Sequence, residues 1–514
     1  MSAYRNDILV GAVLLLIGSA AFVHLGAVPA FEDEGSQLGW IWRASEAGEW
    51  LLPLGDGKPL EAWPMVPLVR LGLAPPLVVT RSLHVLAGMI AAVLTWRLAS
   101  GLLERAPAFA SGALFTICPF AVYLQRLALS DMFLCAAGAW VLVNSSRLTQ
   151  SPTWSRAAAL GASLVLGALC KLPVGLIFLI SMPLALLLMP ASERQRLLQP
   201  PARARLLVAH APAALLALGV IALAVIRYRH GQSPGFGLRD LFGIGLGHYQ
   251  DIGAGAGVSR PDLVVELNTQ LSWPVTVVAL IGVGAAGLLG DWRHRWLIAV
   301  GLLPMIGIGL LVHFWYPRYL LFTLPPLTVA AVSGWQALAF RAGRLRGTVE
   351  VAVLLVCVGC MGWQSARLIL DPLAARWSPL DRFQYFEGWS SGYGYPEAAR
   401  FISAAADAPQ RIYSLDGHSA FQLRNYLPPR WNSRITPIYY TDAGQYLRSE
   451  PARLQNLLEH TPAWIVIPVQ LLDGYLDSTF GRADLRSVID LRRIAVFDKP
   501  GGRVQLAIYE VTRR

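Results

Sequence analysis

Lysine and charged side chains in general are scarce in this chain of 514 residues. Charged residues make up 15% of the sequence, against about a quarter in soluble domains, and hydrophobic residues make up 55%. This composition excludes an ordinary soluble enzyme and indicates a membrane protein. Three of the 43 basic residues are lysines, Lys58, Lys171 and Lys499, and the formal net charge is +11. Because the arginines are scattered between apolar runs rather than gathered on one polar domain, we exclude nucleic acid as a partner.

Cysteine is also rare, and each of the five cysteines lies inside or at the end of an apolar run. Cys357 and Cys360 form a C-x-x-C motif. A zinc site needs two more ligands and a redox site needs polar exposure, and the surrounding apolar run offers neither. We therefore predict that the cysteines are small core residues. The polar C-terminal region has no cysteine, so intrachain disulfides do not stabilise it.

Apolar runs that could cross a bilayer recur up to residue 370. A hydrocarbon core of about 30 Å needs about 20 apolar residues per helix. Runs bounded by charge or proline predict about eleven transmembrane helices: Asp7–Val28, Arg81–Leu102, Pro107–Leu124, Ser130–Ser146, Arg156–Cys170, Leu172–Pro190, Leu206–Ile226, Trp273–Leu289, Trp296–Val312, Tyr319–Phe340 and Thr348–Leu370. We expect residues 1–370 to form an α-helical polytopic membrane domain and residues 371–514 to form a soluble domain.

Arginines in alternate connections between these runs predict the orientation of the chain. The translocation machinery retains positive charge on the cytoplasmic side of a membrane. Together with Arg5, the arginines that fall on one side are Arg105, Arg147, Arg156, Arg194, Arg196, Arg203, Arg205, Arg293, Arg295, Arg341, Arg344 and Arg346. We therefore place the N-terminus in the cytoplasm and, after an odd number of crossings, the C-terminal domain outside the membrane.

Three extracytoplasmic regions are large enough to carry a function. Residues 29–80 form a first outer loop, and residues 228–272 form a glycine-rich loop that we interpret as flexible. Residues 371–514 predict a small α/β domain. Its expected elements are a helix at Pro396–Ala406, strands at Arg411–Leu415 and Trp464–Val469, and a hairpin of Ile494–Phe497 and Val504–Val511 around Lys499-Pro500-Gly501-Gly502.

Charged residues gather where the predicted helices meet the outer surface. They are Glu32, Asp33 and Glu34 after the first helix, Arg126 and Asp131 around a short turn, and Lys58, Lys171 and Arg318 in other outer connections. Charge at the centre of a membrane helix costs about 2.5–3.5 kcal/mol and is normally paired or functional. Taken separately, each group has a structural interpretation. The three acids can form a solvated turn, Arg126 and Asp131 can form an anchoring ion pair, and each cation can extend its side chain to the lipid headgroups. Together they predict a site for a lipid phosphate with a carboxylate facing a sugar or an acceptor hydroxyl.

Motifs in the outer loops carry a family resemblance. They are Phe31-Glu32-Asp33-Glu34-Gly35, Gly48-Glu49-Trp50-Leu51-Leu52-Pro53, Gly57-Lys58-Pro59-Leu60-Glu61-Ala62-Trp63-Pro64, Leu129-Ser130-Asp131, Cys170-Lys171-Leu172-Pro173-Val174-Gly175 and Arg318-Tyr319-Leu320-Leu321. The chain resembles the GT-C superfamily of membrane glycosyltransferases and is most similar to the protein O-mannosyltransferase and lipid A aminoarabinose transferase families. It departs from their Gly-Lys-Pro-Pro-Leu pattern at Leu60, which replaces the second proline.

The resemblance implies a glycosyltransferase of the bacterial inner membrane. It implies transfer of a sugar from a polyprenyl-phosphate-linked donor to an acceptor at the outer face, most simply with inversion at the anomeric carbon. Asp33 would be the general base that takes the proton of the acceptor hydroxyl. The sequence does not name the sugar, or whether the acceptor is a glycan, a lipid or a protein.

The resemblance also implies roles for the other charged residues. Lys58, Arg126, Lys171 and Arg318 would stabilise the departing lipid phosphate. Glu34, Asp131 and Tyr319 would orient the sugar or the acceptor. We expect no metal or other cofactor, because the cations hold the phosphate. A divalent metal at Glu32 and Glu34, as in oligosaccharyltransferases, is the alternative.

Two other functions stay open. A ligase would move a whole glycan from a polyprenyl diphosphate. A transporter or flippase would place ionisable residues and broken helices near the membrane midplane, whereas the charges here collect at one face.

The lysines offer a test of the phosphate site, because an ammonium is a compact point charge and a guanidinium is a planar fork. We expect Lys58→Arg and Lys171→Arg to impair turnover more than Lys499→Arg.

Overall fold

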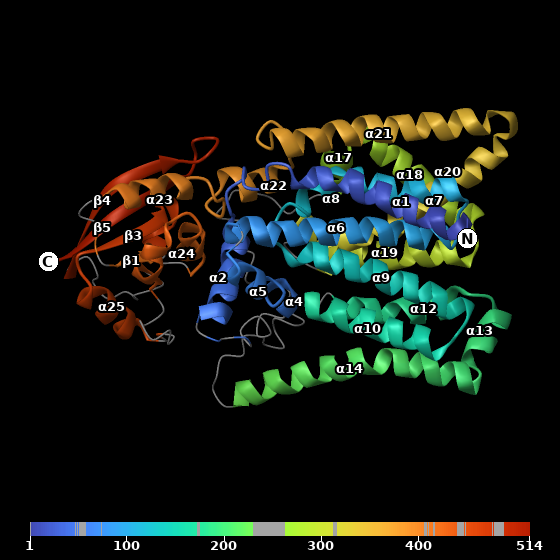
Figure 1. Cartoon of the computed structure of the whole chain (residues 1–514), viewed down its shortest axis with the longest axis horizontal. Helices are drawn as coiled ribbons and strands as arrows, with labels where there is room; N and C mark the ends of the chain where they lie inside the picture. Colours follow the sequence, from blue (N-terminus) through green and yellow to red (C-terminus); the bar gives the residue numbers. More distant parts are fainter. Residues whose placement is uncertain are drawn as a thin grey trace. The chain divides into compact units, whose positions relative to one another are not determined.

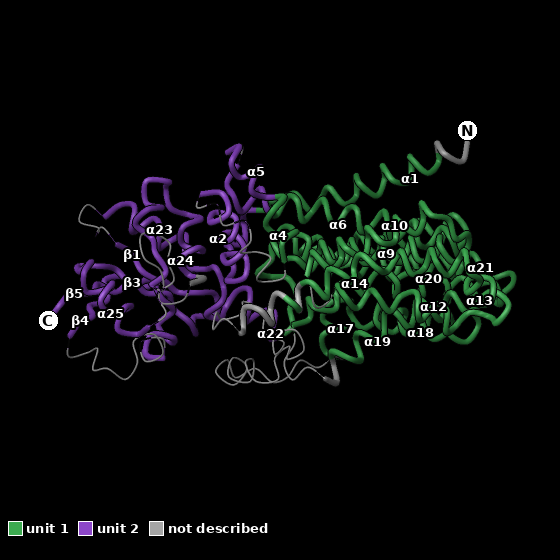
Figure 2. The backbone as a smooth tube through the Cα atoms, turned by 90° about the horizontal axis from the view of Figure 1, so that it is seen from below, with its two compact units in different colours: residues 1–25, 51–64, 81–378 green, residues 26–50, 65–80, 379–514 purple. Residues whose placement is uncertain are grey.

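The computed structural model describes residues 2–46, 48, 50, 58–72, 74–171, 175–229, 263–311, 316–405, 409, 411–414, 417–438, 447, 449–474, 476 and 488–514. The chain divides into two compact units (Figure 2). Unit 1 comprises Met1–Leu25, Leu51–Pro64 and Arg81–Ser378, and unit 2 comprises Gly26–Trp50, Met65–Thr80 and Pro379–Arg514. The first outer loop therefore contributes Lys58 to unit 1 and Asp33 to unit 2.

Unit 1 is helical, and its long helices run side by side in Figure 1. Its elements are α1 (Ser2–Gly18), η1 (Ser19–Phe22), α4 (Pro59–Ala62), most of α6 (Pro76–Ser100), α7 (Arg105–Ile117), α8 (Pro119–Leu124), α9 (Ser130–Gln150), α10 (Trp154–Cys170), η2 (Leu176–Ile180), α12 (Ser181–Leu188), α13 (Ala191–Leu198), α14 (Pro200–Arg229), α17 (Leu263–Leu271), α18 (Trp273–Leu289), α19 (Trp292–Leu311), η3 (Pro317–Thr323), α20 (Leu324–Arg341), η4 (Gly343–Leu345) and α21 (Arg346–Leu370). The predicted helical membrane fold is confirmed, and each predicted apolar run coincides with one or two of these helices.

Fewer of the described helices have the length and hydropathy of a membrane span than the eleven apolar runs predict. Among the described residues, four helices are long and apolar enough to span a membrane: Pro76–Ser100, Pro200–Gly219, Pro317–Arg341 and Gly343–Leu370. A fifth candidate is the pair Val264–Leu271 and Trp273–Leu289, which is bent by 112°. Other runs are split into shorter helices; Pro119, for example, separates α7 from α8 because proline lacks an N–H for the helical ladder. Eleven spans stay a prediction.

Glycines bring helices α18 and α20 into direct backbone contact. A Cβ built on Gly334 would lie 1.8 Å from the carbonyl oxygen of Gly282, and one built on Gly282 would lie 2.4 Å from the carbonyl oxygen of Ala331. Small residues at such positions allow two membrane helices to pack closely. Close packing of this pair shapes one wall of the cavity described below.

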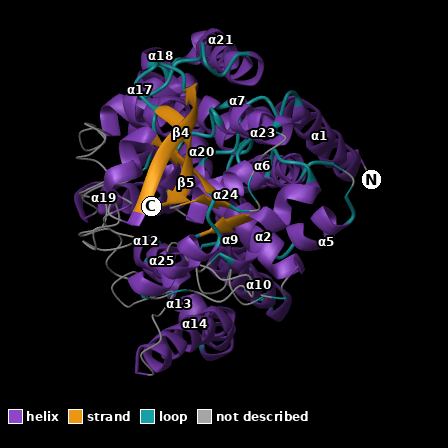
Figure 3. Cartoon of the chain, turned by 90° about the vertical axis from the view of Figure 1, so that its left-hand side faces the viewer, coloured by secondary structure: helices purple, strands orange, loops and turns teal. Residues whose placement is uncertain are grey.

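Unit 2 contains a five-stranded mixed sheet, drawn in orange in Figure 3. Its strands are β1 (Ile412–Ser414), β2 (Ile435–Pro437), β3 (Ala463–Pro468), β4 (Ile489–Asp498) and β5 (Gln505–Arg513), in the order β2-β1-β3-β5-β4. β1 is parallel to β2 and β3, whereas β5 is antiparallel to β3 and β4. The predicted small C-terminal sheet and its final hairpin are thus confirmed, and the predicted helix is α23 (Tyr395–Ala404).

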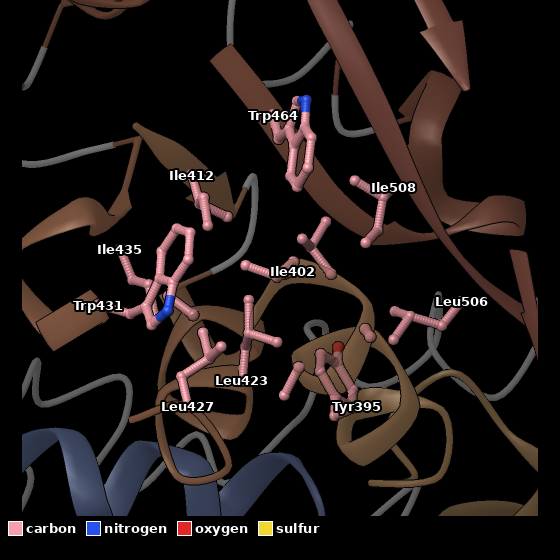
Figure 4. Close-up of a cluster of buried hydrophobic side chains, with 14 residues drawn as sticks. Tyr395, Ile402, Ile412, Leu423, Leu427, Trp431, Ile435, Trp464, Leu506 and Ile508 are labelled. Carbon is pink, nitrogen blue, oxygen red and sulfur yellow. The ribbon is translucent and has the colours of Figure 1, made fainter. Parts of the chain in front are cut away.

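Helices cover both faces of this sheet. On one face, Tyr395 and Ile402 of α23 and Leu423 of α24 (Gly417–Arg424) pack against strand residues such as Ile412 and Ile508 (Figure 4). On the other face, α25 (Glu450–Glu459) contributes Leu457 to a second cluster with the opposite residues of the strands. The remaining short elements of unit 2 are α5 (Met65–Arg70), α22 (Pro379–Arg382), η5 (Phe383–Glu387), η6 (Pro429–Arg434) and η7 (Val469–Leu471).

The acidic segment that the sequence predicts as part of a loop begins a helix, α2 (Glu32–Glu46), which packs on α24 within unit 2. A Cβ on Gly39 would lie 2.5 Å from the ring of Phe421, so glycine permits the close approach. Arg424 also pairs with Glu46 at 2.5 Å and lies over the ring of Trp42. The acids of the first outer loop are therefore carried by an element that is anchored to the C-terminal sheet.

Candidate active site

Asp131 lies at the centre of a buried charge cluster in unit 1. It is in the first turn of α9 and is 3% exposed. Lys171, directly after α10, places its Nζ 2.8 Å from Asp131 Oδ1, and Arg318 of η3 places its Nε 3.9 Å from Oδ2. The structure therefore brings three of the predicted site residues together from separate parts of the chain.

An aromatic wall holds the two cations in place. The ring centroid of Tyr319 is 4.3 Å from Lys171 Nζ and 5.5 Å from Arg318 Cζ, and the ring centroid of Tyr316 is 4.5 Å from the same Cζ. A cation over an aromatic face gains about 0.5–1 kcal/mol or more when it is desolvated. Tyr319, predicted to orient the sugar or the acceptor, is thus a neighbour of both cations.

Glu61 is a member of this cluster that the sequence analysis did not assign a role. Its Oε1 accepts a hydrogen bond of 2.8 Å from the backbone N–H of Ser130, and the residue is 2% exposed. Burial raises the pKa of the Glu61 carboxyl to about 7, although the nearby Lys58 and Lys171 favour its ionised form. The sequence signal that could have identified Glu61 is its position three residues after Lys58 in the same motif. Glu61 lies in the short helix α4, and Lys58 is the N-cap of that helix.

The formal charge of the cluster suits a phosphate. Lys58, Lys171 and Arg318 supply three positive charges, and Asp131 and Glu61 supply two negative charges when both are ionised. The net charge is then +1, and it rises to +2 when Glu61 is protonated. Cations held by buried carboxylates and aromatic rings are already oriented before a ligand arrives, which is the condition for strong electrostatic stabilisation.

Arg126 is engaged elsewhere in unit 1. It is 5% exposed, and its Nη1 donates to the carbonyl oxygens of Ala21 and Val23 at 2.8 and 2.6 Å, while Nη2 donates to that of His24 at 3.3 Å. No ion pair joins the two described residues Arg126 and Asp131, so the anchoring pair considered from the sequence is wrong. The structure does not bring Arg126 to the Asp131 cluster; its guanidinium fixes the chain segment that follows η1.

The three acids of the first outer loop lie in unit 2, at the start of a helix. Glu32, Asp33 and Glu34 occupy the first turn of α2, where the helix dipole favours negative charge. Glu34 is fully buried, and its Oε2 accepts a hydrogen bond of 3.2 Å from the backbone N–H of Phe31, as in a capping box. Asp33 is half-buried. Glu34 therefore caps the N-terminus of α2, a structural role that was not predicted from the sequence.

Lys499 is also a structural residue. It is 2% exposed, and its Nζ donates to the carbonyl oxygens of Gly388, Trp389 and Ser391 at 3.2, 3.0 and 2.5 Å. The ammonium thus holds the turn that precedes α23 against the β4–β5 hairpin. Substitution of Lys499 is expected from the sequence to affect turnover least among the lysines, but its buried ammonium contributes to the stability of unit 2.

A cavity of about 470 Å³ lies within unit 1, lined mostly by apolar side chains of α7, α8, α17, α18, α19, η3, α20 and α21. The 3₁₀ helix η3 separates it from the charge cluster. Pro317, Leu320 and Thr323 line the cavity, at the spacing of three that stacks side chains on one face of such a helix. Arg318, on another face of η3, approaches Asp131. One short helix therefore borders both a cationic site and an apolar cavity.

Comparison with known proteins agrees with the predicted resemblance. The family described as dolichyl-phosphate-mannose-protein mannosyltransferase matches residues 59–226, a range that includes Glu61, Asp131 and Lys171. No curated protein sequence matches the chain.

Solved structures show the same fold over nearly the whole chain. ArnT from Cupriavidus metallidurans in the apo state is 15% identical, covers 99% of this chain and 98% of its own, and has a TM-score of 0.61. The same protein bound to undecaprenyl phosphate is 15% identical, covers 98% and 97%, and also has a TM-score of 0.61. The oligosaccharyltransferase AglB from Archaeoglobus fulgidus, in complex with an inhibitory peptide and a dolichol-phosphate, is 10% identical, covers 98% and 74%, and has a TM-score of 0.57. The chain therefore has the fold of these proteins, and the predicted GT-C fold is confirmed.

Proposed function

We propose that the protein transfers a sugar from a polyprenyl-phosphate-linked donor to an acceptor at the outer face of the membrane. The observation that carries this proposal is the buried cluster in which Asp131 holds Lys171 at 2.8 Å and Arg318 at 3.9 Å beside the apolar cavity. A structure with the same fold is described as bound to undecaprenyl phosphate, which supports a lipid of this class as the ligand.

The cations act on the leaving group. When the bond between the anomeric carbon and the phosphate oxygen breaks, the electron pair stays on that oxygen and the lipid phosphate gains negative charge. Lys171 and Arg318, with Lys58, stabilise this charge because they are oriented before the reaction starts. In this proposal Asp131 positions the cations, and Tyr319 flanks the phosphate. We leave Arg126 out of the phosphate site, because its guanidinium is engaged with three backbone carbonyls.

The apolar cavity accommodates the isoprenoid chain of the donor. Most of its lining is apolar, from Pro317, next to Arg318 in the sequence, to Val353 and Cys357 of α21, and Glu266 and Glu350 are the two acids in the lining. Burial of apolar surface contributes about 25 cal/mol per Å², so even part of a polyprenyl chain in the cavity adds substantial affinity. The cluster on one face of η3 and the cavity on another suit the two ends of one lipid.

Asp33 is the proposed general base. As the acceptor hydroxyl attacks the anomeric carbon from the side opposite the phosphate, its proton passes to Asp33, and the product is inverted. The half-buried Asp33 lies in the first turn of α2. We keep Glu34 as a group that orients the α2 segment. The cytoplasmic N-terminus, the outer location of unit 2 and a bacterial inner membrane are parts of the same proposal.

Reconstitution tests this function directly. The protein in nanodiscs is incubated with undecaprenyl-phosphate-linked sugars and candidate acceptors, and released undecaprenyl phosphate is measured by mass spectrometry. Release that depends on both Asp33 and Lys171 supports the proposal. Release of undecaprenyl diphosphate from diphosphate-linked glycans alone identifies a ligase instead. Movement of labelled lipid across the bilayer with no transfer to an acceptor identifies a flippase.

A further inference from the structure

We infer that Glu61 exchanges a proton as the lipid phosphate binds and leaves, so that the charge of the cation cluster follows the charge of the lipid. This inference rests on the proposed function and adds a residue to the same site. Glu61 is fully surrounded by protein, yet it faces the cations that would hold the phosphate. We treat it as a positioning residue, because it acts on the phosphate through its neighbours.

The surroundings of Glu61 come from three packed elements. Its own helix, α4, supplies Lys58 at the N-cap. Helix α9 supplies the backbone N–H of Ser130, 2.8 Å from Oε1, and the carboxylate of Asp131. The end of α10 supplies the ammonium of Lys171 and the buried thiol of Cys170. Through Asp131 the cluster reaches Arg318 of η3, beside Tyr319.

This environment balances the two protonation states of Glu61. Burial disfavours the carboxylate, whereas Lys58, Lys171 and the Ser130 N–H favour it, and the pKa of Glu61 is about 7 as a result. A small change in local charge therefore changes the protonation of this side chain near neutral pH. The arrival of an anion next to Lys58 and Lys171 weakens their support for the carboxylate and favours uptake of a proton.

The charge of the lipid changes in a matching way during transfer. The sugar-linked donor is a phosphodiester with one negative charge, and the lipid monophosphate that remains carries about −1.5 to −2 near neutral pH. The cluster carries +1 with Glu61 ionised and +2 with Glu61 protonated. Protonation therefore suits the product, and loss of the proton lowers the affinity for it.

Water accepts and supplies the protons of this cycle, so the number of protons balances. The C–O bond to the phosphate breaks with its electron pair left on the phosphate oxygen, and the acceptor oxygen bonds to the anomeric carbon. The acceptor proton goes to Asp33 and then to water, and Glu61 takes one proton from water. When the lipid monophosphate leaves, Glu61 returns that proton to water and the cluster is reset.

A probe of fixed charge separates the titration of Glu61 from that of phosphate. A long-chain prenyl methyl phosphodiester carries one negative charge throughout pH 5.5 to 9, and its affinity for the protein in nanodiscs can be measured by calorimetry. We expect the wild-type affinity to fall about three- to tenfold as the pH rises from 6 to 8.5, since a shift of one pKa unit corresponds to a factor of ten. Glu61→Gln should bind the probe at all pH values as tightly as the wild type does at pH 6. Glu104→Gln, a change at an exposed acid that pairs with Arg346, should keep the wild-type profile.

Two outcomes distinguish the inference from the function on which it rests. If Glu61→Gln shows the same pH dependence as the wild type, Glu61 is not the exchanging group. If no variant binds the probe at any pH, the proposed lipid-phosphate function fails regardless of Glu61. A second measurement uses the wild type alone, so it does not depend on the folding of a variant. Calorimetry of the binding of the same phosphodiester probe at pH 7, in buffers of different ionisation enthalpy, should show net uptake of a fraction of a proton. Zero uptake overturns the inference.

Discussion

Lys171 and Asp131 form an ion pair of 2.8 Å that joins the end of α10 to the first turn of α9. The carboxylate is nearly buried and the ammonium is 15% exposed, so water screens the pair only weakly. The same carboxylate faces Arg318 at 3.9 Å. One acidic side chain thus keeps two cations together.

Replacing Asp131 by asparagine should separate binding from turnover. The change leaves Lys171 and Arg318 without their shared counter-charge, and loss of one partner of a buried pair costs about 3–5 kcal/mol of stability. An anionic lipid then restores part of that loss, so we expect undecaprenyl phosphate to stabilise Asp131→Asn against thermal unfolding more than it stabilises the wild type. Turnover should fall because the product leaves slowly.

Asp7→Asn is the matched control for this experiment. Asp7 also pairs with an arginine at 2.8 Å, but both partners are about 40% exposed. Such a pair contributes about 0–1 kcal/mol, and we expect little change in stability or turnover. Equal effects of the two substitutions would mean that the Asp131 cluster has no special role.

The lysines should respond to arginine in two different ways. Lys171→Arg and Lys58→Arg replace a compact ammonium by a planar fork in the proposed phosphate site, and we expect turnover to fall about tenfold, the equivalent of about 1.4 kcal/mol of transition-state stabilisation. Lys499→Arg should leave the binding of undecaprenyl phosphate unchanged while it destabilises unit 2, because a guanidinium does not fit the three carbonyls around Lys499 Nζ. Hydrogen exchange in β4 and β5 measures the second effect. Loss of lipid binding in Lys499→Arg would contradict this division of roles.

Asp33→Asn should slow the chemical step strongly and preserve binding of the lipid phosphate. A positioned general base contributes about 10²- to 10⁴-fold, so we expect turnover to fall within that range while the dissociation constant of undecaprenyl phosphate stays the same. Glu32→Gln, at the preceding position of the same helical turn, is the control and should keep most of the activity. Full turnover in Asp33→Asn with a correctly folded protein would falsify the assignment of the base.

Filling the apolar cavity should discriminate between donors by chain length. Ala279 of α18 lines the cavity, and Ala279→Trp is expected to raise the KM for an undecaprenyl donor about tenfold and to leave a donor with a single isoprene unit unaffected. Leu288→Trp places the same ring on the same helix at an 82% exposed position and should change neither value. If each variant has the same effect on the KM of both donors, the isoprenoid chain lies outside this cavity.

The helices and the C-terminal sheet could be predicted because local patterns specify them. Apolar runs of bilayer length, the hairpin turn around Lys499 and the spacing of α23 each depend on residues that are near in the sequence. The start of α2 was missed because Glu32, Asp33 and Glu34 were interpreted by their charge, whereas three acids are also a favourable first helical turn.

The site could be predicted only in part, because its members meet through tertiary packing. Lys171 and Asp131 were both selected, Asp131 to orient the sugar or the acceptor or, alternatively, to pair with the nearby Arg126; its ion-pair partners are Lys171 and Arg318. Glu61 carries no signal of burial in its local sequence. Its environment depends on α9 and α10 packing against α4, and no spacing rule reports that contact.

The two-sided arrangement of η3 has a consequence for inhibition. Arg318 is carried by the same short helix whose Pro317, Leu320 and Thr323 border the apolar cavity. A molecule that fills the cavity contacts the helix that carries Arg318, so we expect it to affect the position of this guanidinium without imitating a phosphate. An uncharged, membrane-soluble compound that occupies the cavity is therefore expected to inhibit the protein without binding its cations.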